Sequence, residues 1–262
     1  MDVFILWGPS VLYGLVAVLY LLWLLADVRE ERNSLLRLVL GAVLVHLVAL
    51  VVQWAARGRL PFASMGETLS VSALILAASY VLVEWKVRTT SLGVFFLGPV
   101  FVAMLFSSTV ASSIPMPAHL RSPLFAIHAG AGAAALAVLF ASSLLGGAYL
   151  LQYRQLVGRR FGALARRLPA LPALARAFRL CGALGTALLL LSAVSGAIWI
   201  FRWNLPLGNV VAKTAFVCFT VVWFSVATLL GRRRSFTTTA SARLAMLGGF
   251  LVVLVILVGA HG

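Results

Sequence analysis

The chain has 262 residues, of which 63% are hydrophobic and only 10% are charged, and its formal net charge is +15. Soluble domains carry roughly 25% charged residues, so this composition excludes an ordinary soluble protein and indicates a membrane protein. The basic residues lie in short segments between apolar runs and no nucleic-acid motif accompanies them, so we expect no nucleic-acid partner.

Apolar runs long enough to cross a bilayer recur along the whole chain. A run of about 18 or more residues with few charges predicts a membrane span. We therefore predict an all-α integral membrane protein, with residues 1–262 forming a single polytopic membrane domain. Its eight predicted spans are about 4–26, 34–56, 66–85, 90–112, 124–152, 180–201, 210–230 and 241–260.

The lysines and arginines are divided unequally between alternate loops. Fifteen of the 21 fall in the loops after the first, third, fifth and seventh runs, and five fall in the loops after the other runs. The side richer in Lys and Arg is normally cytoplasmic. Eight spans then place both termini on the outer (periplasmic) face of a bacterial inner (cytoplasmic) membrane.

The longest predicted loop, residues 153–179, falls on the cytoplasmic side. It holds seven arginines interleaved with Leu, Ala and Phe. Such a basic amphipathic segment is typical of a helix that lies on anionic lipid. A binding site for a cytoplasmic partner is the alternative, because basic amphipathic stretches serve both roles.

Four histidines are the main candidates for chemistry. His119, His128 and His261 fall at the predicted outer side, and His46 falls near the middle of the second run. Neutral imidazole binds iron, copper or zinc, and two opposed imidazoles suit haem iron. A structural interpretation stays open, because a histidine at a helix end often lies among lipid headgroups or bonds a neighbouring helix.

Two further segments on the predicted outer side have the composition of a binding site. In RGRLPFASMGETLS, Glu67 stands before a helix, but with Ser64 it also fits an ordinary capping box. In GAIWIFRWNLPLGNVVAK, Trp199 and Trp203 fit either an interfacial aromatic belt or a platform against a flat macrocycle.

Together these segments resemble the cytochrome c assembly family of haem-handling membrane proteins, which includes CcsA, CcmC and HemX-like proteins. The resemblance is strongest over about residues 40–262. The stretch GRLPFASMGETL is similar to the family's outer loop on Gly58, Pro61, Glu67 and Leu69.

The histidines take part in the same resemblance. The helix that opens with RSPLFAIHAG is similar to a family helix that carries an outer haem-ligating histidine, here His128. The closing LGGFLVVLVILVGAHG resembles the final family helix, whose second outer ligand is here His261. His46 matches a histidine of the family's second helix.

The tryptophan-rich loop of the family is only partly matched. The flanking positions are kept by Gly196, Ala197, Trp199 and Lys213. The positions of the family's later tryptophans and aspartate hold Asn204, Gly208, Val210 and Val211. The chain is therefore most similar to the HemX-like or YpjD-like branch of the family.

The resemblance implies haem handling in cytochrome c assembly, with haem b presented or transported at the outer face. Iron ligation is expected from His128 and His261, and His46 is expected as a transient ligand or a polar contact. The other expected cofactor-binding residues are Glu67, Trp199 and Trp203. The haem propionates are expected to pair with one or more of Arg57, Arg59, Arg121 and Arg202.

The implied partners are haem, the lipid bilayer and either apocytochrome c or an assembly partner with a periplasmic domain. No enzymatic activity is assigned. The alternative is a HemX-like, non-enzymatic regulatory or assembly protein that acts through its basic loop 153–179. A small-solute transporter is less well supported, because we find no inverted repeats and no broken midplane helices.

Overall fold

The structure is a computed structural model of the whole chain. It describes residues 4–25, 32–87, 89–110, 117–159, 167–204, 210–230 and 238–260. Every regular element within these ranges is an α-helix or a short 3-10 helix, which confirms the predicted all-α class.

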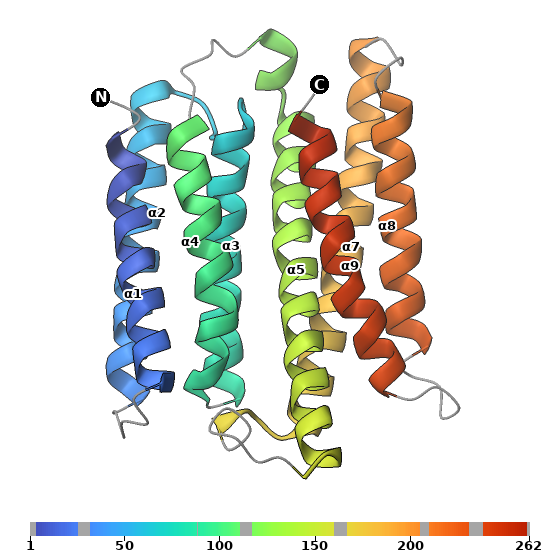
Figure 1. Cartoon of the computed structure of the whole chain (residues 1–262). Helices are drawn as coiled ribbons and strands as arrows, with labels where there is room; N and C mark the ends of the chain where they lie inside the picture. Colours follow the sequence, from blue (N-terminus) through green and yellow to red (C-terminus); the bar gives the residue numbers. More distant parts are fainter. Residues whose placement is uncertain are drawn as a thin grey trace.

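The first four long helices form one group, drawn in blue to green in Figure 1. A 3-10 turn, η1 (Phe4–Leu6), leads into the first of them, and another, η2 (Thr90–Leu92), leads into the fourth. The four helices are α1 (Trp7–Leu25), α2 (Arg32–Arg57), α3 (Met65–Val87) and α4 (Gly93–Val110). α1 packs against α2 and α4, and α3 packs against α2 and α4.

The other four long helices form a second group. A 3-10 turn, η3 (Ala118–Arg121), precedes it. Its helices are α5 (Pro123–Val157), α7 (Leu171–Trp203), α8 (Val210–Leu230) and α9 (Thr238–Ala260). α5 packs against α7 and α9, and it also contacts α3, so the α3–α5 contact joins the two groups.

The described helices bear out a multi-pass membrane protein. Seven of them are long and apolar enough to cross a bilayer, and the stretch Thr214–Leu229 of α8 is a further apolar helix. These eight helices correspond one by one to the eight predicted apolar runs. Large apolar side chains cover their outward surfaces; Phe201 and Phe250, for example, are 82% and 68% exposed, as residues that face lipid would be.

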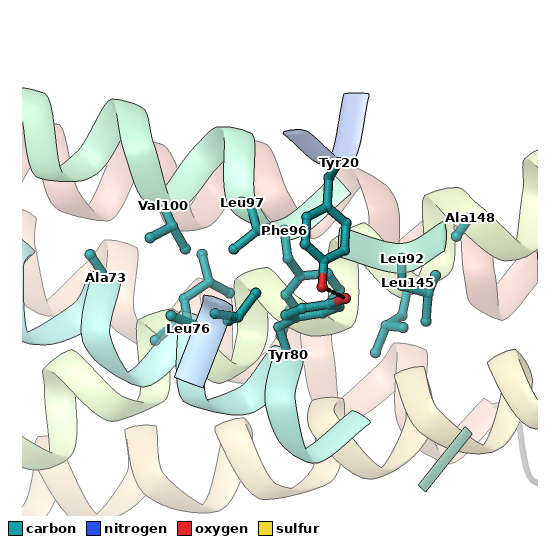
Figure 2. Packing of buried hydrophobic residues seen from close by; sticks show 14 of the residues in the cluster. Tyr20, Ala73, Leu76, Tyr80, Leu92, Phe96, Leu97, Val100, Leu145 and Ala148 are labelled. Atoms are coloured by element: carbon teal, nitrogen blue, oxygen red, sulfur yellow. Dashed lines mark hydrogen bonds between the residues drawn. The ribbon is translucent and has the colours of Figure 1, made fainter. Parts of the chain in front are cut away.

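A buried cluster fills the first group and extends to α5 (Figure 2). Tyr20 of α1 and Tyr80 of α3 meet inside it, with their hydroxyl oxygens 3.0 Å apart in a hydrogen bond. Tyr20 also needs the bare backbone of Gly93, because a Cβ added there would lie 2.2 Å from the Tyr20 ring. The core between α1, α3 and α4 therefore depends on large aromatic side chains set against small residues.

The long helices alternate in direction, so the first and last described residues lie at the same end of the bundle (Figure 1). We call this the upper end; it also carries the connection Gly58–Ser64 and η3. The opposite, lower end carries η2 and the connection from α5 to α7. Which of the two ends faces the outside of the cell stays a prediction from the distribution of charges.

The basic segment 153–179, which the sequence predicted to be a loop, is helical at both of its ends. α5 continues to Val157 and α7 begins at Leu171, so both flanks of the segment extend membrane helices. Residues 160–166 lie outside the described part. Arg167 docks on the first group, where it donates a hydrogen bond of 2.8 Å to the backbone carbonyl oxygen of Trp23.

Candidate functional site

His128 lies near the start of α5, at the upper end. Ser122 caps this helix, because its side chain accepts a hydrogen bond of 3.2 Å from the backbone N–H of Phe125. Pro123 takes the first helical position, where the missing N–H leaves no helical bond unmade. The well-defined helix start therefore fixes the position of the half-buried His128 in the second turn.

The imidazole of His128 is held against α7. Its Nδ1 lies 2.8 Å from the backbone carbonyl oxygen of Ser192 and 3.2 Å from the Ser192 hydroxyl. That hydroxyl donates a hydrogen bond of 2.9 Å to the backbone carbonyl oxygen of His128. The other ring nitrogen, Nε2, makes no hydrogen bond to any residue that the structure describes.

Two aromatic side chains flank this imidazole. The Trp199 ring lies nearly parallel to it, with an interplanar angle of 10° and a centroid distance of 6.3 Å. Phe125, one turn before His128, lies 5.2 Å from Trp199 and 6.4 Å from His128 between ring centroids. Trp203 ends α7 one turn further on and is 41% exposed. The structure thus brings Trp199, rather than Trp203, to the predicted ligand.

Glu67 lies in the first turn of α3 and is completely buried. Its carboxylate accepts hydrogen bonds from Arg57, from Arg59 at 2.8 and 2.9 Å, and from the backbone N–H of Ala63 at 2.8 Å. Its own N–H donates to the Ser64 hydroxyl at 3.3 Å. The capping arrangement that the sequence indicated is therefore present, except that the side chain reaches back to Ala63 instead of Ser64.

The same contacts change the role expected for the two arginines. Arg57 and Arg59 were candidates for haem propionates, but in the structure both form ion pairs with Glu67. Two guanidinium groups and one carboxylate leave this cluster with a formal charge of +1.

The Glu67 cluster and the His128 cluster lie on the two sides of the contact between the helix groups. Phe62, in the connection between α2 and α3, packs on α5: a Cβ added at Gly130 would lie 3.7 Å from its ring. Below it, the Ser72 hydroxyl of α3 donates to the backbone carbonyl oxygen of Ala133 at 3.3 Å. The connection Gly58–Ser64, rather than α2 itself, therefore borders the site.

His46 lies in the interior of the first group and has no exposed surface. Its Nε2 is hydrogen-bonded with the Ser70 hydroxyl at 2.9 Å, and its Nδ1 with the Tyr13 hydroxyl at 3.4 Å. The Ser70 hydroxyl in turn donates to the sulfur of Met104 at 3.7 Å. Both imidazole nitrogens are thus engaged by protein groups, and the iron-ligand role of His46 stays a prediction.

Two predicted residues cannot be placed from the structure. His261 lies outside the described residues, which end at Ala260 of α9. His119 belongs to η3, but its side chain lies outside the described part. α9, the helix that ends just before His261 in the sequence, runs antiparallel to α5 and approaches it closely. A Cβ added at Gly249 would lie 3.0 Å from Ser143.

Comparison with known proteins decides the family. The Cytochrome C assembly protein family model matches residues 34–260, which is most of the chain. The chain belongs to this family. A curated relative, Protein HemX of Brevibacillus brevis, is 29% identical over 199 residues, which cover 72% of either chain. Membership of the cytochrome c assembly family gives the protein a role in cytochrome c biogenesis and confirms the resemblance seen in the sequence.

For this cytochrome c assembly protein, the sequence did not reveal several neighbours of the candidate ligands. Ser192 and Gly196 are one helical turn apart on α7. This spacing is common in membrane helices, so the sequence alone did not indicate that α5 packs against these two residues. Phe125 precedes His128 by three residues, and this helical spacing could have indicated that both side chains share a face.

Proposed function

We propose that this cytochrome c assembly protein binds haem b at its upper end, where Nε2 of His128 would ligate the iron. In this proposal the upper end faces the outside of a bacterial cytoplasmic membrane, where the protein presents haem for cytochrome c maturation. The observation that carries the proposal is the hydrogen bonding of the two ring nitrogens of His128. One ring nitrogen is anchored to α7, and the other has no partner among the described residues.

The side chains around His128 fit a planar, apolar cofactor. Imidazole is a common axial ligand of haem iron. Trp199 and Phe125 add aromatic surface beside the imidazole, and their rings are themselves in contact at 5.2 Å between centroids. Bound haem would supply an iron centre, while these residues would bind one edge of the macrocycle and exclude water from it.

His261 is the second residue that we propose would ligate the iron. Close contacts of Gly249 with Ser143 and of Gly146 with Ala245 set the register of α9 against α5. Continuing this register at 1.5 Å per residue brings Ala260 level with about Gly132, roughly one turn from His128. The next residue is His261, and consecutive Cα atoms are only about 3.8 Å apart. The proposal therefore assigns the second ligand to the residue that follows α9, a helix packed against α5.

Positively charged arginine side chains near the site would bind the haem propionates. Arg57 and Arg59 form ion pairs with Glu67, and Phe62 of the same connection packs on α5 at Gly130. Arg121 and Arg202 are the other arginines at the described upper end. Arginine binds carboxylates through paired N–H donors, which is the chemistry that a propionate needs.

In this proposal the protein positions haem and leaves attachment to a partner. The family's later tryptophan positions hold Asn204, Gly208, Val210 and Val211 in this chain. We propose that apocytochrome c, or an assembly partner with a periplasmic domain, completes the system. The contribution of this chain is then proximity, since holding two reactants together removes much of the entropic barrier to their reaction.

Absorption spectroscopy of the purified full-length protein tests the proposal. After haem supplementation, the wild type should show a Soret band, and His128→Ala should lose or shift it. Free imidazole should restore the wild-type band to His128→Ala by filling the vacated ligand position. His119→Ala is the matched control, because it removes a histidine from the same end and should leave the band unchanged. Equal spectra for the wild type and His128→Ala would overturn the proposal.

A regulatory role of the HemX type is the second candidate, and the replaced tryptophan positions favour it. It would act through the basic segment 153–179. Because Arg167 docks on Trp23, deleting the whole segment would also disturb the fold. A sharper variant replaces Arg154, Arg159, Arg160 and Arg166 with serine and keeps Arg167. A regulator should then lose its effect on its target in cells, whereas a haem carrier should keep its haem spectrum.

A further inference from the structure

His128 and Ser192 each lie over a glycine of the opposite helix. A Cβ added at Gly196 of α7 would lie 2.5 Å from Nδ1 and 2.7 Å from Cε1 of His128. A Cβ added at Gly132 of α5 would lie 3.0 Å from the Ser192 hydroxyl oxygen. His128 and Gly132 are four residues apart on α5, and Ser192 and Gly196 are four residues apart on α7. At this level the two helices therefore interlock by two matching contacts, each between a side chain and a glycine of the opposite helix.

The hydrogen bonds of this interlock determine which nitrogen of His128 carries the proton. A carbonyl oxygen can only accept, so at 2.8 Å from the Ser192 carbonyl oxygen Nδ1 must be the donor. The Ser192 hydroxyl uses its own proton on the His128 carbonyl oxygen, at 2.9 Å. Neutral imidazole has one N–H, so the lone pair is on Nε2.

We infer that Ser192 and Gly196 are positioning residues for the proposed haem ligand, an inference that rests on the proposed function. They hold His128 with its proton on Nδ1, which leaves the lone pair of Nε2 available to a ligand. Gly196, which has no side chain, leaves space for the imidazole ring. The backbone carbonyl oxygen of Ser192 accepts the hydrogen bond from Nδ1, and the Ser192 hydroxyl donates to the backbone carbonyl oxygen of His128. Partners of this kind orient ligating histidines and tune their basicity.

Substitution of Gly196 tests the inference directly. Gly196→Ala should displace the imidazole from the Ser192 carbonyl oxygen and weaken haem binding by about 10- to 100-fold, the usual effect of disturbing the outer contact of a ligating histidine. Gly185→Ala is the matched control. It lies on the same helix and faces α5, where its Cβ would come within 2.7 Å of Leu139, but it is remote from His128. It should leave haem affinity and the absorption spectrum unchanged.

Ser192→Ala is a second variant that cannot introduce a clash. It removes the hydroxyl and keeps the backbone carbonyl that accepts from Nδ1. The expected loss of haem affinity is therefore smaller, about 2- to 10-fold, as for one neutral hydrogen bond. The reduction potential of bound haem should also shift, because the anchoring of the ligand has changed; a substitution that acted on packing alone would leave it in place.

A measurement without haem separates this inference from the proposed function. NMR of the full chain labelled with ¹⁵N-histidine, with His128 assigned by comparison with His128→Gln, reports which ring nitrogen carries the proton. The wild type and Gly185→Ala should show the proton on Nδ1, and Gly196→Ala should lose this preference. An unchanged tautomer and unchanged haem affinity in Gly196→Ala would overturn the inference, even if His128→Ala abolished haem binding. A wild type that binds no haem would overturn the proposed function and the ligand role inferred from it, whatever the tautomer.

Discussion

Arg167 lies over the ring of Trp23, with its guanidinium carbon 4.5 Å from the ring centroid. It also donates a hydrogen bond of 2.8 Å to the backbone carbonyl oxygen of Trp23. Its own carbonyl oxygen accepts from the hydroxyls of Thr89 and Ser91 at 3.0 and 2.8 Å. The connection between α5 and α7 therefore ties the second helix group to the first at the lower end.

Replacing Arg167 should weaken this tie. Arg167→Ala removes a cation–π contact and a charged hydrogen bond, and we expect it to lower the free energy of unfolding by about 1–3 kcal/mol. Arg167→Lys keeps the charge but loses the planar stacking, so its loss should be smaller. Thermal unfolding of the detergent-purified protein measures both. Identical melting of Arg167→Ala and the wild type would show that the contact does not stabilise the fold.

Glu67→Gln should be more destabilising than an ordinary surface substitution. The change keeps the shape of the side chain but removes the carboxylate that pairs with both Arg57 and Arg59 beneath the surface, and breaking such a buried pair costs about 3 kcal/mol or more. Arg59→Gln is the milder comparison, because Arg57 and Ala63 still bind the carboxylate. Combining Glu67→Gln with Arg59→Gln should recover part of the loss in unfolding experiments. Strictly additive losses would rule out coupling between the two charges.

The hydrogen bond between Tyr20 and Tyr80 (Figure 2) can be measured by a double-mutant cycle. Tyr80→Phe and Tyr20→Phe should each lower the free energy of unfolding by about 1 kcal/mol, the typical net value of one hydrogen bond. The double variant should lose less than the sum of the two, because both single changes break the same bond. Additive losses would place the energetic effect elsewhere, such as in the hydrogen bond from Tyr80 to the Thr90 carbonyl oxygen.

His46→Phe should destabilise the first helix group, because it leaves the buried hydroxyls of Tyr13 and Ser70 without their imidazole partner. Each orphaned buried polar group costs about 1–3 kcal/mol. Ser70→Ala is the matched comparison and should cost less, since it removes one of the two partners together with its bond. The haem spectrum of folded His46→Phe distinguishes the two roles of this residue: an unchanged Soret band fits a polar contact, and a lost band fits a ligand.

The helices were predictable because their signal is long and redundant. Each predicted run has about the 20 residues or more that a bilayer requires, so an error of a few residues at its ends does not change the order of the helices. The boundaries were less accurate where basic residues extend a helix beyond the apolar run. α7 begins at Leu171, nine residues before the predicted span at 180, because the arginines of its first turns are compatible with helix at a membrane surface.

The candidate site was predictable in its residues but not in its contacts. The position of His128 relative to helix ends followed from the sequence pattern and the family resemblance. Its contact with Ser192 did not, because it joins residues 64 positions apart and depends on the register between two helices. The pairing of Glu67 with both arginines was likewise hidden, since the sequence shows only that opposite charges flank the same short connection.

The double use of the Glu67 carboxylate limits how this part of the chain can vary. It accepts the Ala63 N–H just before α3 and forms ion pairs with two guanidinium groups at the same time. A single substitution at residue 67 therefore alters the nucleation of a membrane helix and the electrostatic potential of the upper end together. Relatives or designed variants that change one of these properties without the other will need compensating replacements at Arg57 or Arg59. Correlated substitution among the three positions is the evolutionary signature to expect.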